Sequence, residues 1–188
     1  MRRVFVYEYL SGGGSLGHEA EVAALLPLGA AMRDAIVSDL HALPEFAVTC
    51  AVCARPGAGA AHDTLPTATA RAGEDPVAFV QRQAAAHDLA WVVAPETDGL
   101  LLRFAQAVDT PRWIGCRPDA IRVASSKRAT LEALAARGVP TPLSFGPRLT
   151  RRWIVKPDDG AGAVATRVHD DAVAAQADLA QRRRRRRA

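Results

Sequence analysis

Short apolar runs predict strands in the first 120 residues of the chain. Residues 4–10 are rich in β-branched and aromatic side chains and stop at a glycine cluster, which indicates a buried strand that ends in a tight turn. Similar runs predict strands at 46–54, 89–94 and 113–115. Residues 55–73 have no clear period and are expected to form a loop.

Helix signals fall between these strands. Apolar residues recur at spacings of three or four over residues 25–40, which predicts a helix with Pro27 near its first turn. Asp75 and Pro76 suit the cap and first position of a second helix, and Asp98 is expected to open a third. This alternation predicts an α/β domain in which helices cover both faces of a parallel sheet.

The pattern changes near residue 120. A helix is expected from Ser125 or Ser126 to Gly138, and strands over 152–155 and 165–168 predict a hairpin with a glycine-rich tip. The predicted organisation is a domain over 1–120, a smaller α+β unit over 121–180 that ends in a helix over 171–180, and an arginine-rich tail over 181–188.

The positive charge of the chain lies in this tail. The 188 residues include 24 Lys and Arg against 20 Asp and Glu, for a formal net charge of +4, but residues 182–187 are all arginine and the remainder is mildly acidic. Charge therefore indicates no nucleic-acid partner, except through the tail itself. No apolar stretch approaches the roughly 20 residues that span a bilayer, so we expect a cytoplasmic protein without a membrane segment.

Gly12, Gly14 and Gly17 follow the first strand with the Gly-x-Gly-x-x-Gly spacing of a dinucleotide-binding turn. Arg55, just after the second strand, would contact a 2′-phosphate in that interpretation. The same glycines also suit a flexible turn at the carboxyl end of a strand, where open α/β sheets bind ligands. A non-catalytic dinucleotide-binding module that uses Gly12 to Gly17 is therefore one functional hypothesis.

A second glycine cluster favours a different phosphate site. Lys156 follows a predicted strand and precedes Gly160 and Gly162, so that an ammonium and backbone N–H groups would converge on phosphate oxygens. The order excludes a Walker A loop, because the lysine precedes the glycines. An ordinary hairpin with a surface lysine is the alternative. Lys127, the only other lysine, begins a helix that would pack beside the hairpin, and it favours the phosphate interpretation.

The chain resembles the ATP-grasp superfamily up to about residue 180. The segments that carry the resemblance are Ser126-Lys127, Gly138-Val139-Pro140-Thr141-Pro142, Ile154-Val155-Lys156-Pro157 and Asp159-Gly160-Ala161-Gly162. The resemblance implies a Rossmann-like pre-ATP-grasp domain followed by the first, incomplete α+β subdomain of an ATP-grasp fold. Within the superfamily, Tyr7-Glu8-Tyr9-Leu10-Ser11-Gly12-Gly13-Gly14 resembles the start of the tyramine:glutamate ligases of methanofuran biosynthesis and their bacterial relatives.

This resemblance implies a ligase that uses ATP and Mg²⁺ to phosphorylate a carboxylate and then joins it to an amine, for example glutamate to tyramine. The catalytic residues stay unassigned. The implied nucleotide-binding residues are Lys127, Lys156, Asp159, Gly160, Ala161 and Gly162, and the candidate substrate residues are Glu8, Gly12, Gly13 and Gly14.

The sequence departs from the superfamily pattern after Gly162. The hinge strand, the second subdomain and the acidic residues and Asn that hold Mg²⁺ have no counterpart, so no metal ligand is assigned. We interpret the arginine run as a premature end or a frame shift rather than a genuine basic tail, and we expect this chain alone to be inactive. A homodimer and the identities of the acid and amine stay open.

Overall fold

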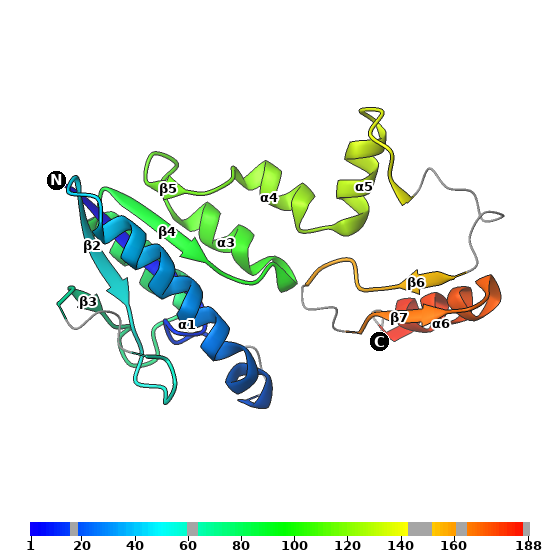
Figure 1. The fold of residues 1–188 in the computed structure, drawn as a ribbon, viewed down its shortest axis with the longest axis horizontal. Coiled ribbons are helices and arrows are strands. Elements are labelled where there is room, and N and C mark those ends of the chain that lie inside the picture. The colour runs from blue at the N-terminus through cyan, green and yellow to red at the C-terminus, as the bar shows by residue number, and fades with distance from the viewer. Residues whose placement is uncertain (16–18, 60–63, 143–151, 161–164, 186–188) are drawn as a thin grey trace. The chain divides into compact units, whose positions relative to one another are not determined.

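The computed structural model describes residues 1–15, 19–59, 64–142, 152–160 and 165–185 of the chain. The chain forms two compact units (Figure 1). Unit 1 comprises Met1–Pro95 and Gly99–Pro118, and unit 2 comprises Glu96–Asp98 and Asp119–Ala188. Gly17, Ala161 and Gly162, which belong to the two predicted glycine clusters, lie outside the described residues.

Among its described residues, unit 1 contains a five-stranded parallel sheet, which confirms the predicted α/β fold class. The strands are β1 (Arg2–Glu8), β2 (Phe46–Ala51), β3 (Thr67–Ala68), β4 (Leu89–Val93) and β5 (Trp113–Ile114). Their order is β3-β2-β1-β4-β5, so the first strand is the central one. Val4 of β1 pairs with Val48 on one side and with Leu89 on the other.

The strand β3 corrects the prediction of a loop over 55–73. Thr67 and Ala68 pair with Cys50 and Ala51 at the edge of β2. Two residues are too few to show a strand period in the sequence, and pairing with an existing edge is what makes them a strand.

The two faces of β1 contribute to different parts of the core. Phe5 and Tyr7 cluster with Phe79, whereas Val4 and Val6 belong to a second cluster. Successive side chains of a strand point to opposite faces of the sheet, so a continuous apolar strand fits a sheet that is covered on both sides. The Phe5 and Phe79 rings meet edge to face, with centroids 5.8 Å apart.

The helix after β1 begins earlier than predicted. It is α1 (Glu19–His41), and Pro27 lies inside it rather than near its first turn. Glu19 and Glu21 lie in its first turn, where carboxylates interact favourably with the helix dipole. Pro27 is exposed, so water can reach the Ala23 carbonyl that its missing N–H leaves without a helical partner.

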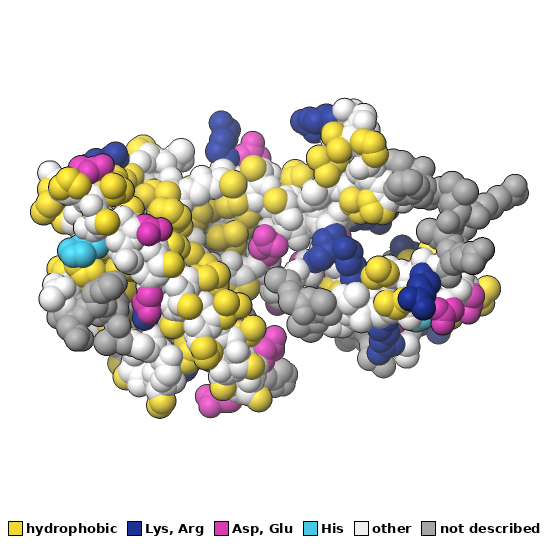
Figure 2. All heavy atoms as spheres, in the orientation of Figure 1, with side chains coloured by type: hydrophobic (Ala, Val, Ile, Leu, Met, Phe, Trp, Pro, Cys, Tyr) yellow, Lys and Arg dark blue, Asp and Glu magenta, His cyan; other side chains and the backbone are white. Residues whose placement is uncertain are grey.

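The outer side of α1 is also apolar. Leu25, Leu28 and Met32 are exposed hydrophobic residues, and Figure 2 shows hydrophobic side chains along the visible face of this helix. Apolar residues on the exposed side as well as on the buried side blur the 3.6-residue period, which explains why the sequence pattern misplaced the start of the helix.

The next two helices of unit 1 differ in how they begin. α2 (Pro76–Ala86) confirms the predicted cap, because Asp75 Oδ1 accepts hydrogen bonds from the N–H groups of Val77 at 2.9 Å and Ala78 at 3.2 Å. α3 (Leu100–Ala107) is capped by Gly99 without a side-chain hydrogen bond. Asp98 therefore does not cap this helix as predicted; it lies in a short 3₁₀ turn with a left-handed φ of 52°.

The described residues of unit 2 form a two-stranded antiparallel sheet and three helices. Its elements are α4 (Pro118–Ala124), α5 (Lys127–Ala135), β6 (Trp153–Val155), β7 (Arg167–His169) and α6 (Ala172–Arg185). The pairing of Ile154 with Val168 confirms the predicted hairpin, whereas α4 was not predicted. None of the helices that the structure describes is both long and apolar enough to cross a membrane.

The last helix extends beyond its predicted end into the arginine run. α6 continues to Arg185, so the assignment of residues 181–188 to a separate tail needs correction for its first part. Arg182 Nε and Nη2 donate hydrogen bonds to the Asp178 carboxylate at 2.9 and 3.0 Å. Arginine is a good helix former, and this pairing one turn apart supports the extension.

Candidate functional site

Hydrogen bonds join the start of α5 to the turn that follows β6. Ser126 caps α5 as predicted, because its Oγ accepts a hydrogen bond from the Ala129 N–H at 3.0 Å. The Asp158 carboxylate accepts further bonds from the Ser126 hydroxyl at 2.7 Å and from the Arg128 N–H at 2.9 Å. The Lys127 N–H donates to the Asp158 carbonyl at 2.9 Å. N–H groups that a helix start leaves without helical partners are thus satisfied by a residue far along the chain.

The Lys127 side chain contacts the same turn. Its Nζ donates hydrogen bonds to the carbonyl oxygens of Gly160 at 2.8 Å, Asp159 at 3.0 Å and Asp158 at 3.3 Å. The structure therefore brings together three residues of the predicted nucleotide group, Lys127, Asp159 and Gly160. Gly160 has a φ of 78°, a left-handed conformation that favours glycine and allows the tight turn.

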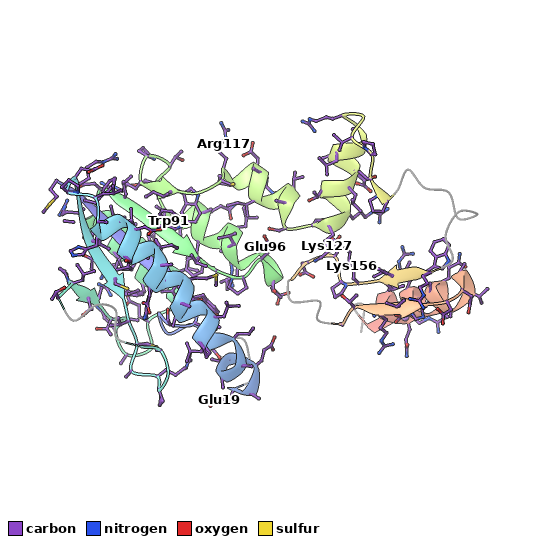
Figure 3. All side chains as sticks on the ribbon, viewed as in Figure 1. Glu19, Trp91, Glu96, Arg117, Lys127 and Lys156 are labelled. Carbon is purple, nitrogen blue, oxygen red and sulfur yellow. The ribbon has the colours of Figure 1, made fainter. Side chains whose placement is uncertain are left out.

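Lys156 lies at the carboxyl end of β6 with its side chain exposed (Figure 3). Within the described part of the chain, its ammonium has no hydrogen-bond or ion-pair partner. It lines a cavity of about 280 Å³ between β6 and α6. The other lining residues are Trp153, Ile154 and Val155 of β6 and Ala172, Ala175, Gln176 and Leu179 of α6.

Side chains of the hairpin in unit 2 differ in how far they are exposed to solvent. Ile154 and Val168 lie directly opposite each other and are 64% and 58% exposed, whereas Val155 is buried. Two exposed β-branched side chains, with the exposed Lys156 after Val155, give this hairpin an apolar surface with a cation at its end.

The network around Asp178 holds α6 against the hairpin. Arg182 of α6, His169 of β7 and Arg167 of β7 all lie within 3.4 Å of its carboxylate. The hydrogen bond from Arg182, together with that from His169, lowers the pKa of Asp178 to about 2. The wall of the cavity is therefore fixed by charged hydrogen bonds as well as by apolar packing.

In unit 1, the N–H groups of the glycine turn after β1 donate hydrogen bonds to nearby carbonyl groups of the chain. The N–H groups of Gly12, Gly13 and Gly14 donate to the carbonyls of Glu8, Leu10 and Tyr9 at 2.8, 3.2 and 2.7 Å. A dinucleotide-binding turn needs such groups for a pyrophosphate. In this conformation they are engaged within the chain, which counts against the dinucleotide hypothesis although α1 begins at Glu19, soon after the glycines.

Close packing accounts for two of these glycines. A Cβ at Gly12 would lie 2.4 Å from the Tyr7 ring, and a Cβ at Gly14 would lie 2.4 Å from the Tyr9 ring. Arg55, the candidate 2′-phosphate ligand, instead donates from Nη1 to the carbonyls of Leu10 at 3.1 Å and Gly14 at 2.9 Å. The turn is thus a compact structure held by its neighbours.

Glu8, a candidate substrate residue, supports this turn from inside. Its side chain is buried, and its carboxylate accepts hydrogen bonds from the N–H groups of Leu10 at 3.1 Å and Ser11 at 2.8 Å. A Cβ at Gly29 of α1 would lie 2.7 Å from the carboxylate. Glu8 therefore shapes the turn, and its oxygens point to the chain's own N–H groups.

Sequence reasoning missed Asp158 and the cavity lining of α6. Asp158 sits beside the predicted loop residue Asp159, but its partners lie 30 and 32 residues away and no local pattern indicates them. The α6 side of the cavity did have a signal. Ala172, Ala175, Gln176 and Leu179 recur at spacings of three and four, the period of one helix face.

The described residues gather no metal site made of protein ligands alone. Among them, no three His, Cys, Asp or Glu side chains come together in a way that could hold a metal ion. Mg²⁺ prefers oxygen ligands in octahedral geometry and is commonly held by one or two carboxylates together with substrate phosphates. No step that depends on protein-bound Mg²⁺ is therefore derived from this chain.

Comparisons with known proteins found one matching family model and similar solved structures. Residues 46–121 match the family model of the pre ATP-grasp 3 domain, and no curated protein sequence matches the chain. The structure resembles that of an Archaeoglobus fulgidus protein assigned to the ATP-grasp superfamily, with 20% identity, a TM-score of 0.53 and coverage of 85% of this chain and 48% of that one. It also resembles D-alanine–D-alanine ligase from Bacillus anthracis, with 12% identity, a TM-score of 0.53 and coverage of 96% and 53%.

These comparisons fix the fold class. The chain spans about half the length of the two solved structures. At these identities the structural likeness concerns the fold alone, and nothing in the comparisons points to tyramine:glutamate ligases in particular. The chain has the mixed α/β fold of ATP-grasp structures, and its residues 46–121 match a pre-ATP-grasp domain.

Proposed function

We propose that this chain comprises the substrate domain and the first nucleotide-binding subdomain of an ATP-dependent ligase that joins a carboxylate to an amine, and that ATP binds along β6 of unit 2. The observation that carries the proposal is Lys156, which follows β6, lines an apolar cavity, precedes the Gly160 turn in the sequence and has no partner among the described residues. The pre-ATP-grasp match and the ATP-grasp fold supply the reaction class.

The cavity suits a flat apolar base with a phosphate chain attached. Its volume of about 280 Å³ is close to the lower end of small-molecule sites, about 300 Å³. Trp153 and Leu179 offer apolar surface for the base, and Gln176 offers an amide for hydrogen bonds to it. Lys156 supplies the point charge that phosphate oxygens need.

The proposed reaction has two steps. An oxygen of the substrate carboxylate attacks the γ-phosphorus of ATP, which forms an acyl phosphate and releases ADP. The amine then attacks the acyl carbon, which forms the amide, releases phosphate and frees one proton. Phosphoryl transfer depends mainly on positioning and charge neutralisation, so a lysine aimed at the phosphates and a fixed turn beside it are the contributions we assign to this chain.

Unit 1 is the proposed substrate side. Its sheet reverses strand order at β1, with β2 on one side and β4 on the other, and open α/β sheets bind ligands at the carboxyl ends of such strands. The turn over residues 9–14 lies at that point. We assign Glu8, Gly12, Gly13 and Gly14 to shaping it, and we propose glutamate and an amine such as tyramine as substrates because of the resemblance of residues 7–14 to that branch.

Isothermal titration of the full chain with ATP and with NADPH tests the proposal. We expect ATP to bind more tightly than NADPH and the substitution Lys156→Met to weaken ATP binding about tenfold to a hundredfold, because a charge-assisted hydrogen bond contributes about 1.5–3 kcal/mol. The matched control is Arg152→Met, which removes an exposed cation outside the cavity lining. Equal losses in both variants, or a preference for NADPH, would contradict the proposal.

A further inference from the structure

We infer that Arg55 of unit 1 binds a second carboxylate of the acid substrate, one that does not react, and thereby selects a dicarboxylic acid. The inference rests on the proposed function and names the class of acid that the ligase accepts. The superfamily resemblance assigns no role to Arg55, and the dinucleotide hypothesis gave it a 2′-phosphate instead.

Arg55 lies where the first two strands of the sheet end. It follows β2, and its Nη1 donates hydrogen bonds to the carbonyls of Leu10 at 3.1 Å and Gly14 at 2.9 Å in the turn after β1. β1 and β2 are parallel neighbours, so their carboxyl ends share one edge of the sheet. Open α/β sheets bind ligands at this edge, where the strand order reverses. The guanidinium therefore lies where unit 1 is expected to hold its substrate.

One edge of this guanidinium is free to bind a ligand. Arginine has five N–H donors in a fixed fork, and Nη1 uses its donors on the two carbonyls of the turn. Among the described residues, Nε and Nη2 have no partner, and both stay accessible to solvent. The Nε–H and Nη2–H bonds form the parallel pair that can bind both oxygens of a carboxylate.

Arg55 is held in place before a ligand binds, and its charge is not paired. Its carbonyl accepts a hydrogen bond from the N–H of the buried Ala58 at 3.1 Å, and its side chain is half-buried. A side chain that is already fixed loses less entropy on binding. Glu8, at the base of the turn, is buried and accepts the N–H groups of Leu10 and Ser11. No carboxylate in the described part of the chain forms an ion pair with Arg55.

A carboxylate that is held by both oxygens suits recognition better than reaction. In the proposed first step, the reacting carboxylate gives up its negative charge as one oxygen bonds to the γ-phosphorus of ATP. A guanidinium bound to that group would stabilise the substrate more than the transition state and would slow the step. A second carboxylate keeps its charge throughout. Arg55 therefore fits an acid with two carboxylates, and glutamate belongs to this class.

NMR titration of the full chain without ATP tests this inference with two probes that differ in one group. Glutarate has two carboxylates, and glutaric acid monoamide has an amide in place of one of them. We expect the wild-type chain to bind glutarate about tenfold to a hundredfold more tightly, the effect of one charge-assisted pair. Glutarate should also shift the Arg55 Nε–H signal, which is assigned by its loss in Arg55→Gln.

Variants separate ligand binding from support of the turn. We expect Arg55→Gln to abolish the preference for glutarate, and Arg55→Lys to reduce it, because an ammonium is not a bidentate fork. The second variant decides the matter if the first does not fold. Arg103→Gln is the matched control, because it removes an exposed cation of α3 and should keep the preference. A residue that only supports the turn would, when replaced, weaken both probes equally.

That equal weakening would overturn the inference, and so would a wild-type chain that binds neither probe or binds both equally. Inorganic phosphate is the third probe, because a guanidinium also binds phosphate oxygens in pairs. Phosphate binding that depends on Arg55 and is tighter than glutarate binding would overturn the inference as well. ATP is absent from these titrations, so a chain that fails to bind ATP would contradict the proposed function and leave the result for Arg55 unchanged.

Discussion

At the scale of single residues, Glu8 shows how a candidate substrate group becomes part of the structure. Glu8 is 3% exposed, and its carboxylate accepts hydrogen bonds from two N–H groups of the turn that follows it. A buried carboxylate costs free energy unless its oxygens are hydrogen-bonded, and these bonds meet that requirement. Gly29 leaves the space that the carboxylate occupies, because any larger residue there would overlap with it.

The substitution Gly29→Ala tests this packing. Alanine in a helix interior is favoured over glycine by about 1 kcal/mol, but its Cβ would lie 2.7 Å from the Glu8 carboxylate, and overpacking costs roughly 1–3 kcal/mol. We expect a lower free energy of unfolding in urea for this variant. Ala24→Gly, at an exposed position of the same helix, measures the propensity effect alone. A more stable Gly29→Ala protein would show that Glu8 does not need this space.

At the scale of elements, the docking of α6 on the hairpin depends on Asp178. The strands β6 and β7 form a two-stranded sheet, and such a pair is marginally stable without a covering element. α6 covers it, and Asp178 links the helix to Arg167 and His169 of β7. The cavity next to Lys156 exists only while this helix stays in place.

The pKa of Asp178 predicts how this docking responds to acid. The folded-state pKa is about 2, below the ordinary value of 3.8, so the carboxylate contributes stability above the ordinary pKa and loses it as the pH falls toward 2. We expect Asp178→Asn to flatten the pH dependence of unfolding in this window. Asp170→Asn, which changes a carboxylate that is 89% exposed, should retain the wild-type dependence. Identical pH profiles for both variants would contradict the role of Asp178.

Elements with a local signal were predicted well, and those that depend on distant partners were not. The strand over residues 4–10 and the caps at Asp75 and Ser126 follow from nearby residues, and the structure confirms all three apart from small shifts at the ends. β3 forms only through pairing with β2. In the same way, the hydrogen bonds of Asp158 and the packing of Glu8 against α1 arise from residues that the fold brings together.

At the scale of the whole molecule, the two units have different roles in the proposed function. Unit 1 has a central buried strand and a compact turn at the carboxyl end of that strand. Unit 2 has both lysines, the glycine turn and the cavity. The charge pattern agrees with this division, because the two lysines lie in unit 2 and the sequence otherwise uses arginine for its positive side chains.

The central claim, that ATP binds along β6, is tested most directly by fluorine NMR. The chain has three tryptophans: Trp91 in β4 and Trp113 in β5 of unit 1, and Trp153 in the cavity lining of unit 2. With 5-fluorotryptophan incorporated and each signal assigned by a Trp→Phe variant, we predict that ATP shifts the Trp153 resonance most strongly. A shift confined to Trp91 or Trp113, or no shift at any ATP concentration, would contradict the account.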